Sequence, residues 1–268
     1  MNELRPEADL HCHILPEWDD GPRDWDETLA LARAASESGI RYILVTPHVG
    51  RKLRGIEEKP SDSIVPASRA LEEKLRAEGV EISLVPAAEL TMDSEDLAAR
   101  LKAEPNLTVG GQGYYALIES TFNRWPAYAE RLLQDVFFAG VTPIIAHPER
   151  YAEVQRDPMI LRTAFEKGAL MQITARSFLG EDDRRVKACA LALLKANMVS
   201  IIASDAHNAR AVFPEAVVET VVKTVGESAA RRILIENPRK ILAGDPVYNP
   251  DVKGARSSGG FLGKLLGR

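Results

Sequence analysis

Asp9-Leu10-His11-Cys12-His13 lies near the start of the chain and is followed by Asp19-Asp20-Gly21. Side chains of a β-strand alternate between its two faces, so His11 and His13 point the same way from an extended segment. Such a pair is a potential metal clamp, whereas Cys12 points to the opposite face and packs there. A His-x-His pair alone also occurs as two exposed or hydrogen-bonded histidines, so the rest of the chain has to decide between these interpretations.

The other three of the five histidines also mark strand ends. His48, His147 and His207 each follow a short run rich in Ile, Val or Ala. Histidines without a common role would scatter over helices and loops. Their placement instead predicts that the strands end at one mouth, as the carboxyl ends of the strands do in a parallel barrel.

The hydrophobic pattern predicts strands and helices in alternation. We expect strands at residues 8–15, 41–46, 81–87, 114–118, 142–146, 169–174 and 199–203. We expect helices at residues 24–39, 65–78, 94–103, 128–138, 158–167, 182–196, 214–225 and 228–236, with an end at Asn237-Pro238. The Gly-rich turn at residues 110–113 precedes a strand, so it is not a phosphate loop. About seven strands, each followed by a helix, predict an α/β fold built as a parallel barrel.

Composition bounds the class of protein. The chain has 268 residues, 45% hydrophobic and 27% charged, which suits one globular α/β domain over residues 1–249. A net charge of -5 argues against nucleic acid as the main partner. Two distant cysteines predict no disulfide scaffold and fit a reducing cytoplasm. No signal peptide or membrane span is predicted, so we expect a cytoplasmic protein without stable membrane insertion.

The last residues, 250–268, form a Gly/Ser-rich linker that ends in a short basic, amphipathic segment. This tail is expected to be flexible, and the alternative is a contact with a membrane surface or a partner. A second basic stretch, from Val49 to Ile64, contains Arg51, Lys52, Arg54 and Lys59. We interpret it as a mobile loop beside the mouth.

The predicted mouth carries more ligands than one metal ion needs. The candidates are His11, His13, Asp20, His48, Glu89, Glu119, His147, Asp205 and His207. They could hold two or three divalent ions, and mixed imidazole and carboxylate ligands suit Mn, Fe or Zn better than Ca. The alternatives are that Glu89 and Glu119 cap turns, and that Asp20 stabilises a turn before Gly21 or that Asp19 binds metal in its place.

Clustered divalent ions are suited to phosphoester hydrolysis, because they bind phosphate oxygens and lower the pKa of water. Arg150 and Arg210 follow His147 and His207 by three residues and could clamp a phosphate, although surface ion pairs are the alternative. Thiol-dependent phosphatase chemistry needs an arginine six residues after the cysteine. Trp18 and Lys195 occupy those positions, which argues against that chemistry.

These residues resemble the polymerase and histidinol phosphatase (PHP) superfamily, and within it the bacterial manganese-dependent protein-tyrosine phosphatases of the CpsB/CapC type. The matching segments are residues 9–16 with Asp19-Asp20-Gly21, Thr46-Pro47-His48, Ala88-Glu89, residues 116–119, residues 146–151, residues 203–208 and residues 237–241. They run in order through nearly the whole domain. Cys12 replaces a commoner serine, and the tail after Pro250 has no identified counterpart.

The resemblance implies a distorted (β/α)7 TIM-like barrel, the PHP fold, with three Mn²⁺ sites. By position, His11, His13, Glu89 and Asp205 would hold one ion; Glu89, Glu119 and His147 a second; and Asp20, His48 and His207 a third. Arg150 and Arg210 would bind phosphate, and His48 and His207 are also counted as catalytic. The implied activity is hydrolysis of phosphotyrosine on the tail of a membrane-associated tyrosine kinase that controls capsular or exopolysaccharide synthesis.

Other functions remain open at this stage. A small-molecule phosphatase of the same superfamily, such as one acting on histidinol phosphate, is the main alternative. A catalytically silent partner of the kinase need not keep every ligand, so the intact set argues against it. An amidohydrolase also uses His-x-His on a barrel, but it would have a bridging lysine where this chain has Glu119.

Overall fold

The computed structural model describes residues 4–50, 53, 55, 57–92, 96–120, 123–180 and 183–253. Its strands are β1 (Ala8–Cys12), β2 (Tyr42–Val45), β3 (His48–Val49), β4 (Ser83–Pro86), β5 (Glu89–Thr91), β6 (Tyr115–Glu119), β7 (Thr142–Ala146), β8 (Leu170–Thr174) and β9 (Ile201–Ala203). The pairing is parallel throughout, in one sheet of order β1-β2-β4 and another of order β3-β5-β6-β7-β8-β9.

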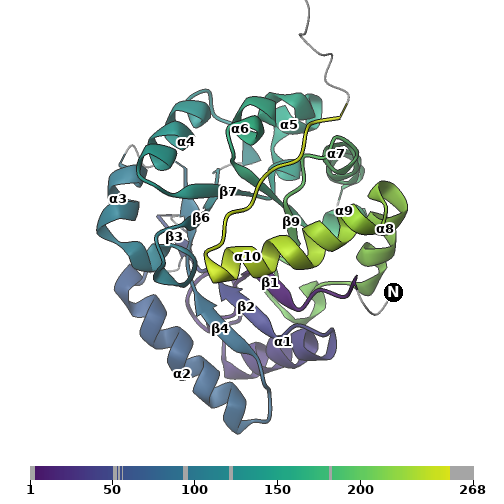
Figure 1. The fold of residues 1–268 in the computed structure, drawn as a ribbon. Helices are drawn as coiled ribbons and strands as arrows, with labels where there is room; N and C mark the ends of the chain where they lie inside the picture. The colour runs from purple at the N-terminus through teal and green to yellow at the C-terminus, as the bar shows by residue number, and fades with distance from the viewer. Residues whose placement is uncertain are drawn as a thin grey trace, which may run out of the picture.

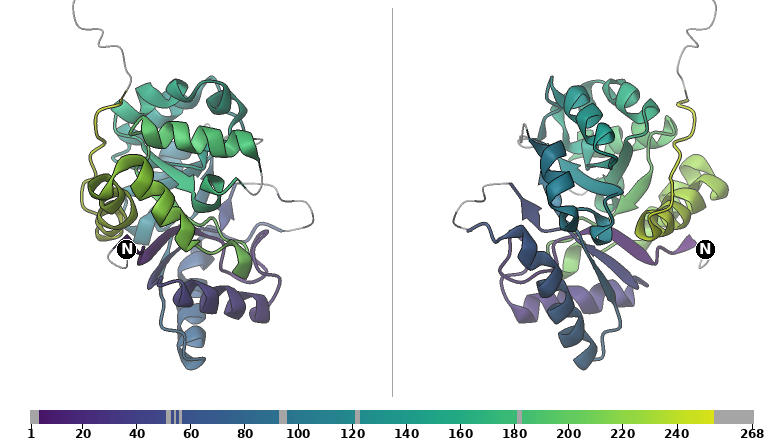
Figure 2. Two further views of the ribbon diagram at one scale, coloured as in Figure 1. Left: turned by 90° about the vertical axis from the view of Figure 1, so that its right-hand side faces the viewer. Right: turned by 60° about the vertical axis from the view of Figure 1, so that its left-hand side comes forward.

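Helices surround these strands. Their bounds are α1 (Trp25–Glu37), α2 (Ile64–Ala77), α3 (Leu97–Ala103), α4 (Ala129–Phe138), α5 (Ala152–Arg156), α6 (Arg162–Glu166), α7 (Arg184–Lys195), α8 (Glu215–Val225), α9 (Glu227–Arg231) and α10 (Asn237–Ala243). In Figures 1 and 2, α1 and α2 flank the smaller sheet, while α3 to α7 surround the larger one.

The two sheets together make one closed barrel. Strands β2 and β3 are one barrel strand interrupted at Thr46-Pro47, and β4 and β5 are another interrupted at Ala87-Ala88. Backbone hydrogen bonds bridge the interruption, from Ala87 N to Val45 O (3.0 Å) and from Glu89 N to Pro47 O (3.0 Å). A bridge between Cys12 and Ala206 closes the ring from β1 to β9. The predicted seven-stranded TIM-like barrel is therefore confirmed, in a distorted form.

The prediction was wrong where it ended two strands at residues 46 and 87. Each strand resumes two residues later, as β3 and β5. The first interruption follows from Pro47, which has no N–H to donate to the neighbouring strand. A resumed strand of two or three residues is too short to show a hydrophobic period in the sequence.

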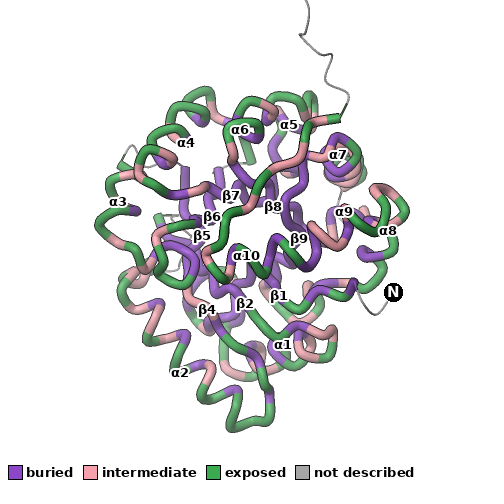
Figure 3. Tube along the Cα trace, in the orientation of Figure 1, coloured by how far each residue is buried: buried purple, intermediate pink, exposed green. Residues whose placement is uncertain are grey.

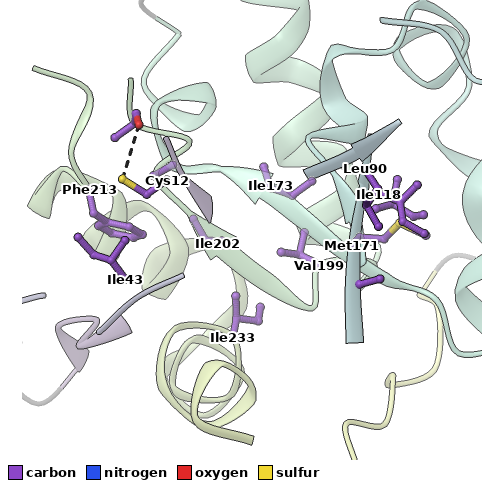
Figure 4. Close-up of a cluster of buried hydrophobic side chains, with 14 of the residues drawn as sticks. Cys12, Ile43, Leu90, Ile118, Met171, Ile173, Val199, Ile202, Phe213 and Ile233 are labelled. Carbon is purple, nitrogen blue, oxygen red and sulfur yellow. Dashed lines mark hydrogen bonds between the residues drawn. The ribbon is translucent and has the colours of Figure 1, made fainter. Parts of the chain in front are cut away.

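Alternation along the strands separates two buried apolar layers of side chains. Figure 3 shows that the strand residues that carry them are mostly buried. Inside the barrel lie side chains such as Leu44, Leu117 and Leu170. The layer between strands and helices contains Ile43, Cys12, Phe213, Leu90, Ile118 and Met171, which Figure 4 shows. Inward positions near the strand carboxyl ends are polar, so the barrel interior changes from an apolar base to a polar mouth.

A bulge in β1 decides which way its histidines face. Leu10 belongs to the barrel interior, whereas Cys12 belongs to the outer layer beside the helices. In a regular strand, residues two positions apart point to the same face, so Leu10 and Cys12 would not point to opposite sides. The pairing of β1 with β2 shifts between Asp9 and Cys12, and this irregularity turns His11 and His13 toward the mouth. The predicted outward packing of Cys12 is confirmed.

The amino-terminal end of the barrel is covered by α10, which lies across the strands in Figure 1. Ile241 of this helix is fully buried against the interior layer. The predicted end of a helix at Asn237-Pro238 was wrong, because the helical chain continues to Ala243. A π-helical stretch, Arg232–Glu236, precedes the proline, and its wider turn accommodates the missing N–H and the bulk of the ring.

Other helix boundaries shift by a few residues. Helix α5 was not predicted, and residues 158–167 form a 3₁₀ turn followed by α6. The predicted helix starts at residues 94 and 182 lie outside the described residues, as do Arg51, Lys52 and Arg54 of the basic loop and residues 254–268 of the tail. None of the described helices combines the length and apolar character that spanning a bilayer requires.

Candidate metal centre

All nine predicted ligands converge at the carboxyl ends of the barrel strands. His11 lies in β1 and His13 directly follows that strand, Glu89 and Glu119 lie in β5 and β6, and His48 lies in β3. The others follow strand ends: His147 after β7, Asp205 and His207 after β9, and Asp20 in the turn after β1. Most are buried, whereas the side chains of Asp20 and His207 are 41% and 28% exposed. The cluster therefore has a buried floor and an open side.

Glu89 is the centre of the buried floor. Its Oε1 lies 3.0 Å from Nε2 of His147 and 3.3 Å from Nε2 of His11. Its Oε2 lies 2.9 Å from Nδ1 of His48 and 3.4 Å from Nε2 of His13. Pairing of β3 with β5 sets His48 beside Glu89 in register. One carboxylate facing four imidazoles has the position expected of a bridge between cations.

The open side is formed around Asp20. Its Oδ1 lies 3.2 Å from Nε2 of His207 and 3.4 Å from Nε2 of His48. The neighbouring Asp19 has a different role, because its side chain is buried and binds Nδ1 of His13 at 2.7 Å. Asp19 also accepts hydrogen bonds from the backbone N–H groups of His48 and Gly21. The sequence left the choice between the two aspartates open, and the geometry places Asp20 among the candidate ligands.

Three histidines have a hydrogen-bond acceptor at Nδ1. Asp19 faces Nδ1 of His13, the Asp205 carbonyl faces that of His207 at 3.0 Å, and the Gln172 amide faces that of His11 at 3.0 Å. In a neutral imidazole the hydrogen then lies on Nδ1, and the lone pair lies on Nε2.

Two of these lone pairs face each other, since Nε2 of His11 and Nε2 of His13 are 3.2 Å apart. Lone pairs at this distance repel unless a cation or a proton lies between them. Carboxylate oxygens of Glu89 and Asp205 surround the same position, at 3.3 Å from Nε2 of His11. The residues present therefore fit divalent cations.

The pKa shifts describe how the cluster balances its charges with protons alone. Burial opposes a charge on His13, but the Asp19 carboxylate and the contact with Glu89 together raise the pKa of His13 to about 10. Burial opposes a charge on His48 as well, but the carboxylates of Glu89, Asp20 and Glu119 together raise the pKa of His48 to about 12. Burial favours neutral Glu89, yet His11 and His48 hold the pKa of Glu89 well below its usual range. Divalent ions would take the place of these protons.

The ligand atoms fall into four groups, each with all atoms within 4.8 Å of one another. They are His13/Asp20/His48/His207, His11/His13/Asp205, His11/Glu89/His147 and His48/Glu89/Glu119. Two of the three predicted ion sites overlap with these groups. Asp20, His48 and His207 share a group that also contains His13, and His11, His13 and Asp205 form a group without the predicted Glu89. Glu119 and His147, assigned to one ion by the resemblance, belong to different groups that share Glu89. The division of ligands among ions remains a prediction.

Two candidate ligands have unusual backbone conformations. His147 has a φ of 34° and Asp205 a φ of 56°, both in the left-handed region that residues other than glycine rarely adopt. Each follows the end of a barrel strand, and the turn aims its side chain into the cluster. Strain of this kind is concentrated at functional sites, where the surrounding structure maintains it.

The two predicted phosphate-binding arginines have different surroundings. Arg150 contacts Asp205, with Nη1 2.6 Å from Oδ2, and its side chain is 34% exposed. It thus lies at the edge of the cluster and faces solvent in part. Arg210 is exposed in a 3₁₀ turn after β9, and its backbone carbonyl accepts a hydrogen bond from Arg176. The structure brings Arg150 into contact with a candidate ligand, but it gives no such contact for Arg210.

Several positioning residues were missed from the sequence. Glu149 is fully buried and accepts hydrogen bonds from Thr174 N (2.9 Å) and Ser177 Oγ (2.7 Å), which joins the turns after β7 and β8. Asp19 and Gln172 hold imidazoles in place, as described above. The Asp-Asp-Gly segment pointed to Asp19 in the sequence. Nothing in the sequence pointed to Gln172, because it lies 161 residues from His11 along the chain.

Fold and site together define a TIM-like α/β barrel protein whose mouth carries a histidine and carboxylate cluster suited to divalent ions. The chain belongs to the CpsB/CapC family, because the family described as "Capsular polysaccharide synthesis, CpsB/CapC" matches residues 7–243. The resemblance identified from the sequence is therefore confirmed.

Named relatives agree with this assignment. Tyrosine-protein phosphatase YwqE of Bacillus subtilis (strain 168) is 38% identical over 205 residues, which cover 75% of this chain and 78% of YwqE. Tyrosine-protein phosphatase CpsB of Streptococcus pneumoniae is 28% identical over 242 residues, covering 87% and 97% of the two chains. A solved structure matches with a TM-score of 0.84 and 33% identity, covering 91% of this chain and 98% of the other. It comes from crystal structures of YwqE and CpsB described as unique metal-dependent tyrosine phosphatases.

Proposed function

We propose that this protein is a metal-dependent protein-tyrosine phosphatase that hydrolyses phosphotyrosine to tyrosine and phosphate. One observation carries the proposal: Glu89 faces four imidazoles on the buried floor of the mouth, beside an open side formed by Asp20 and His207. A phosphate monoester can enter only from an open side. The names of YwqE and CpsB support tyrosine phosphate as the substrate.

When bound, divalent ions would bind phosphate oxygens, lower the pKa of the attacking water and offset the charge on the leaving oxygen. The nine candidate ligands would hold two or three such ions. We favour Mn²⁺, because imidazole and carboxylate ligands without a thiolate suit Mn²⁺, and Fe and Zn are the alternatives to test. This preference rests on the donor set and on the family.

Arg150 would bind and orient the phosphate group. A guanidinium presents five N–H donors in a planar fork, and the contact with Asp205 fixes one side of it at 2.6 Å. The other N–H donors of the guanidinium would form bidentate hydrogen bonds with phosphate oxygens. His48 and His207 border the open side with Asp20, so both lie where the phosphate enters. Arg210 is kept as a candidate for a more peripheral contact.

The expected substrate is the phosphotyrosine-bearing tail of a membrane-associated tyrosine kinase that controls capsular or exopolysaccharide synthesis. The family description places the relatives in capsular polysaccharide synthesis. A kinase tail of this kind lies in the cytoplasm, so the proposal includes a cytoplasmic location. Catalysis is assigned to residues 1–249, and the tail of residues 250–268 is given no part in the chemistry.

The test compares two substrates with metal-stripped protein reloaded with Mn²⁺, Fe²⁺ or Zn²⁺. Hydrolysis of a phosphotyrosine peptide and of histidinol phosphate is followed by phosphate release, with and without EDTA. We expect faster turnover of the peptide, and no turnover in EDTA. Glu89→Gln should be inactive, whereas Glu130→Gln on the exposed face of α4 should match the wild type.

Two results would contradict the proposal. Faster turnover of histidinol phosphate would make the protein a small-molecule phosphatase. Absence of turnover for both substrates under every metal, in protein shown to bind the ions, would remove the proposed activity while leaving the fold and the cluster unchanged.

A further inference from the structure

The strand β8 contributes none of the nine candidate ligands, although every other barrel strand contributes at least one in the described part of the chain. We infer that β8 serves the site through Gln172, a positioning residue that fixes the tautomer of His11 and makes Nε2 its cation-binding atom. This inference rests on the proposed function, because it assumes that the cluster binds divalent ions.

Gln172 has a suitable place in the barrel. It is fully buried, and it faces inward with Leu170, while Met171 and Ile173 face the helices. Its pairing partner on β7 is Ala146, the residue before His147. A long polar side chain at this level of the barrel interior reaches the candidate ligands from below.

The hydrogen bonds decide how the Gln172 amide is oriented. One amide atom lies 3.2 Å from the backbone N of His147 and 3.0 Å from Nδ1 of His11. A backbone N–H can only donate, so the atom that faces His147 has to be the side-chain oxygen, Oε1. Because Oε1 can only accept, Nδ1 of His11 has to carry the hydrogen of the second bond. The lone pair of neutral His11 is thereby placed on Nε2.

The position of Nε2 shows why this tautomer matters. It lies 3.3 Å from oxygens of both Glu89 and Asp205 and 3.2 Å from Nε2 of His13. With the other tautomer, His11 would present an N–H to this group of ligand atoms and could not bind a cation there. The lone pair on Nδ1 would also face the lone pairs of Gln172 Oε1. The amide therefore selects the form of His11 that can act as a ligand.

The second histidine of the pair is held by a different kind of acceptor. Asp19 binds Nδ1 of His13 at 2.7 Å and carries a full negative charge. Gln172 performs the same task for His11 without charge. The cluster already contains the carboxylates of Asp20, Glu89, Glu119 and Asp205, so a neutral acceptor fixes the ring without adding another buried charge.

Two substitutions at Gln172 distinguish the role of its acceptor oxygen from that of its size and shape. Gln172→Met keeps length and volume but removes the acceptor, and Gln172→Glu keeps an oxygen at the same place. Loss of an outer hydrogen-bond partner of a metal-binding histidine lowers metal affinity by roughly 10- to 100-fold. We expect a loss of that size for Gln172→Met and no loss for Gln172→Glu, which keeps an acceptor oxygen and adds a negative charge that attracts cations. The matched control is Gln112→Met, an exposed glutamine that binds the Leu242 carbonyl far from the mouth.

The affinity test uses the full chain, stripped of metal and titrated with Mn²⁺ by calorimetry. A double-mutant cycle with His11→Ala shows whether Gln172 acts through His11. In the His11→Ala background, Gln172→Met should lower the affinity by less than about 3-fold, since the ring that it positions is gone. A loss that keeps its full size in this background would assign the effect to the His147 backbone and overturn the inference.

The tautomer itself is read by NMR of the wild-type protein loaded with Zn²⁺, which is diamagnetic. Long-range ¹H–¹⁵N spectra should show a protonated Nδ1 and a metal-bound Nε2 for His11. The opposite pattern would overturn the inference even if Gln172→Met does not fold. A wild-type protein that binds neither Zn²⁺ nor Mn²⁺ would overturn the proposed function as well, whereas an active, metal-loaded protein with an unaffected Gln172→Met variant would overturn this inference alone.

Discussion

Asp19→Asn is the substitution that most clearly separates positioning from metal binding. Asp19 accepts three hydrogen bonds: from His13 Nδ1 (2.7 Å) and the His48 backbone N (3.0 Å) at Oδ2, and from the Gly21 backbone N (3.0 Å) at Oδ1. Asparagine has the same shape but only one acceptor oxygen. If that oxygen takes the Oδ2 position, the NH₂ group faces the N–H of Gly21, and two donors meet.

The size of the effect follows from these contacts. A hydrogen bond to a charged acceptor contributes about 1.5–3 kcal/mol, and a neutral one about 1 kcal/mol, so the His13 bond weakens by about 0.5–2 kcal/mol. The donor left without an acceptor at Gly21 costs about 1–3 kcal/mol more. Gly21 cannot shift easily, because a Cβ at this position would lie 2.4 Å from the His13 carbonyl oxygen. We expect a total loss of about 1.5–5 kcal/mol in the free energy of unfolding.

Urea denaturation of the metal-free variant measures this loss, and Mn²⁺ calorimetry measures the weaker binding, which should be roughly 10- to 100-fold. Asp26→Asn on the exposed side of α1 is the control and should change the free energy of unfolding by less than about 0.5 kcal/mol. Wild-type stability together with wild-type Mn²⁺ affinity in Asp19→Asn would refute the assignment of Asp19 as the residue that holds His13.

Three further predictions concern protons, the core and the substrate. The pKa of His13 is raised to about 10 and that of His48 to about 12, so in the metal-free protein their stabilising contribution is complete below pH 6.5 and is lost as pH rises through these values. Metal ions compete with the same protons, so the Mn²⁺-induced rise in Tm should increase from pH 6 to pH 8.5. Tyr151→Phe removes a buried hydroxyl that accepts a hydrogen bond from Ser120 N at 2.9 Å, and urea denaturation should show a loss of about 1–3 kcal/mol. Arg150→Lys keeps the charge but loses the planar fork, so kcat/KM for a phosphotyrosine peptide should fall by roughly 10-fold or more, with little change in Mn²⁺ affinity.

Each of these predictions has a contrary result. A Tm difference between loaded and metal-free protein that narrows with rising pH would contradict the proton competition. Unchanged stability of Tyr151→Phe would show that its hydroxyl contributes nothing net to folding. Wild-type kcat/KM for Arg150→Lys would remove the phosphate-binding role of the guanidinium.

Much of the barrel could be predicted because its strands are long apolar runs that end in a polar residue. The strand at residues 142–146 was predicted with the bounds that β7 has. The convergence of histidines was predictable too, since parallel strands bring their carboxyl ends to one mouth. An apolar run of five residues or more is long enough to indicate a strand from the sequence. Histidines at the ends of several strands mark the same mouth more than once.

The sequence could not show features that depend on partners distant in the chain. β5 has three residues, and its place in the barrel comes from pairing with β6 rather than from any period. Helix continuation past Pro238 depends on a π-helical turn that no residue type specifies. Gln172 reads as an ordinary strand residue until the fold sets it against His11 and His147. Ligand types could therefore be predicted, whereas the residues that orient them could not.

Hydrolysis of phosphotyrosine at this mouth is proposed to depend on several divalent ions held there. The most direct test of this dependence is the rate of phosphotyrosine-peptide hydrolysis by metal-stripped protein as Mn²⁺ is added in known equivalents. We expect no turnover without metal, and a rate that rises until two or three equivalents are bound. Undiminished turnover by the metal-free protein, or full activity with a single equivalent, would contradict it.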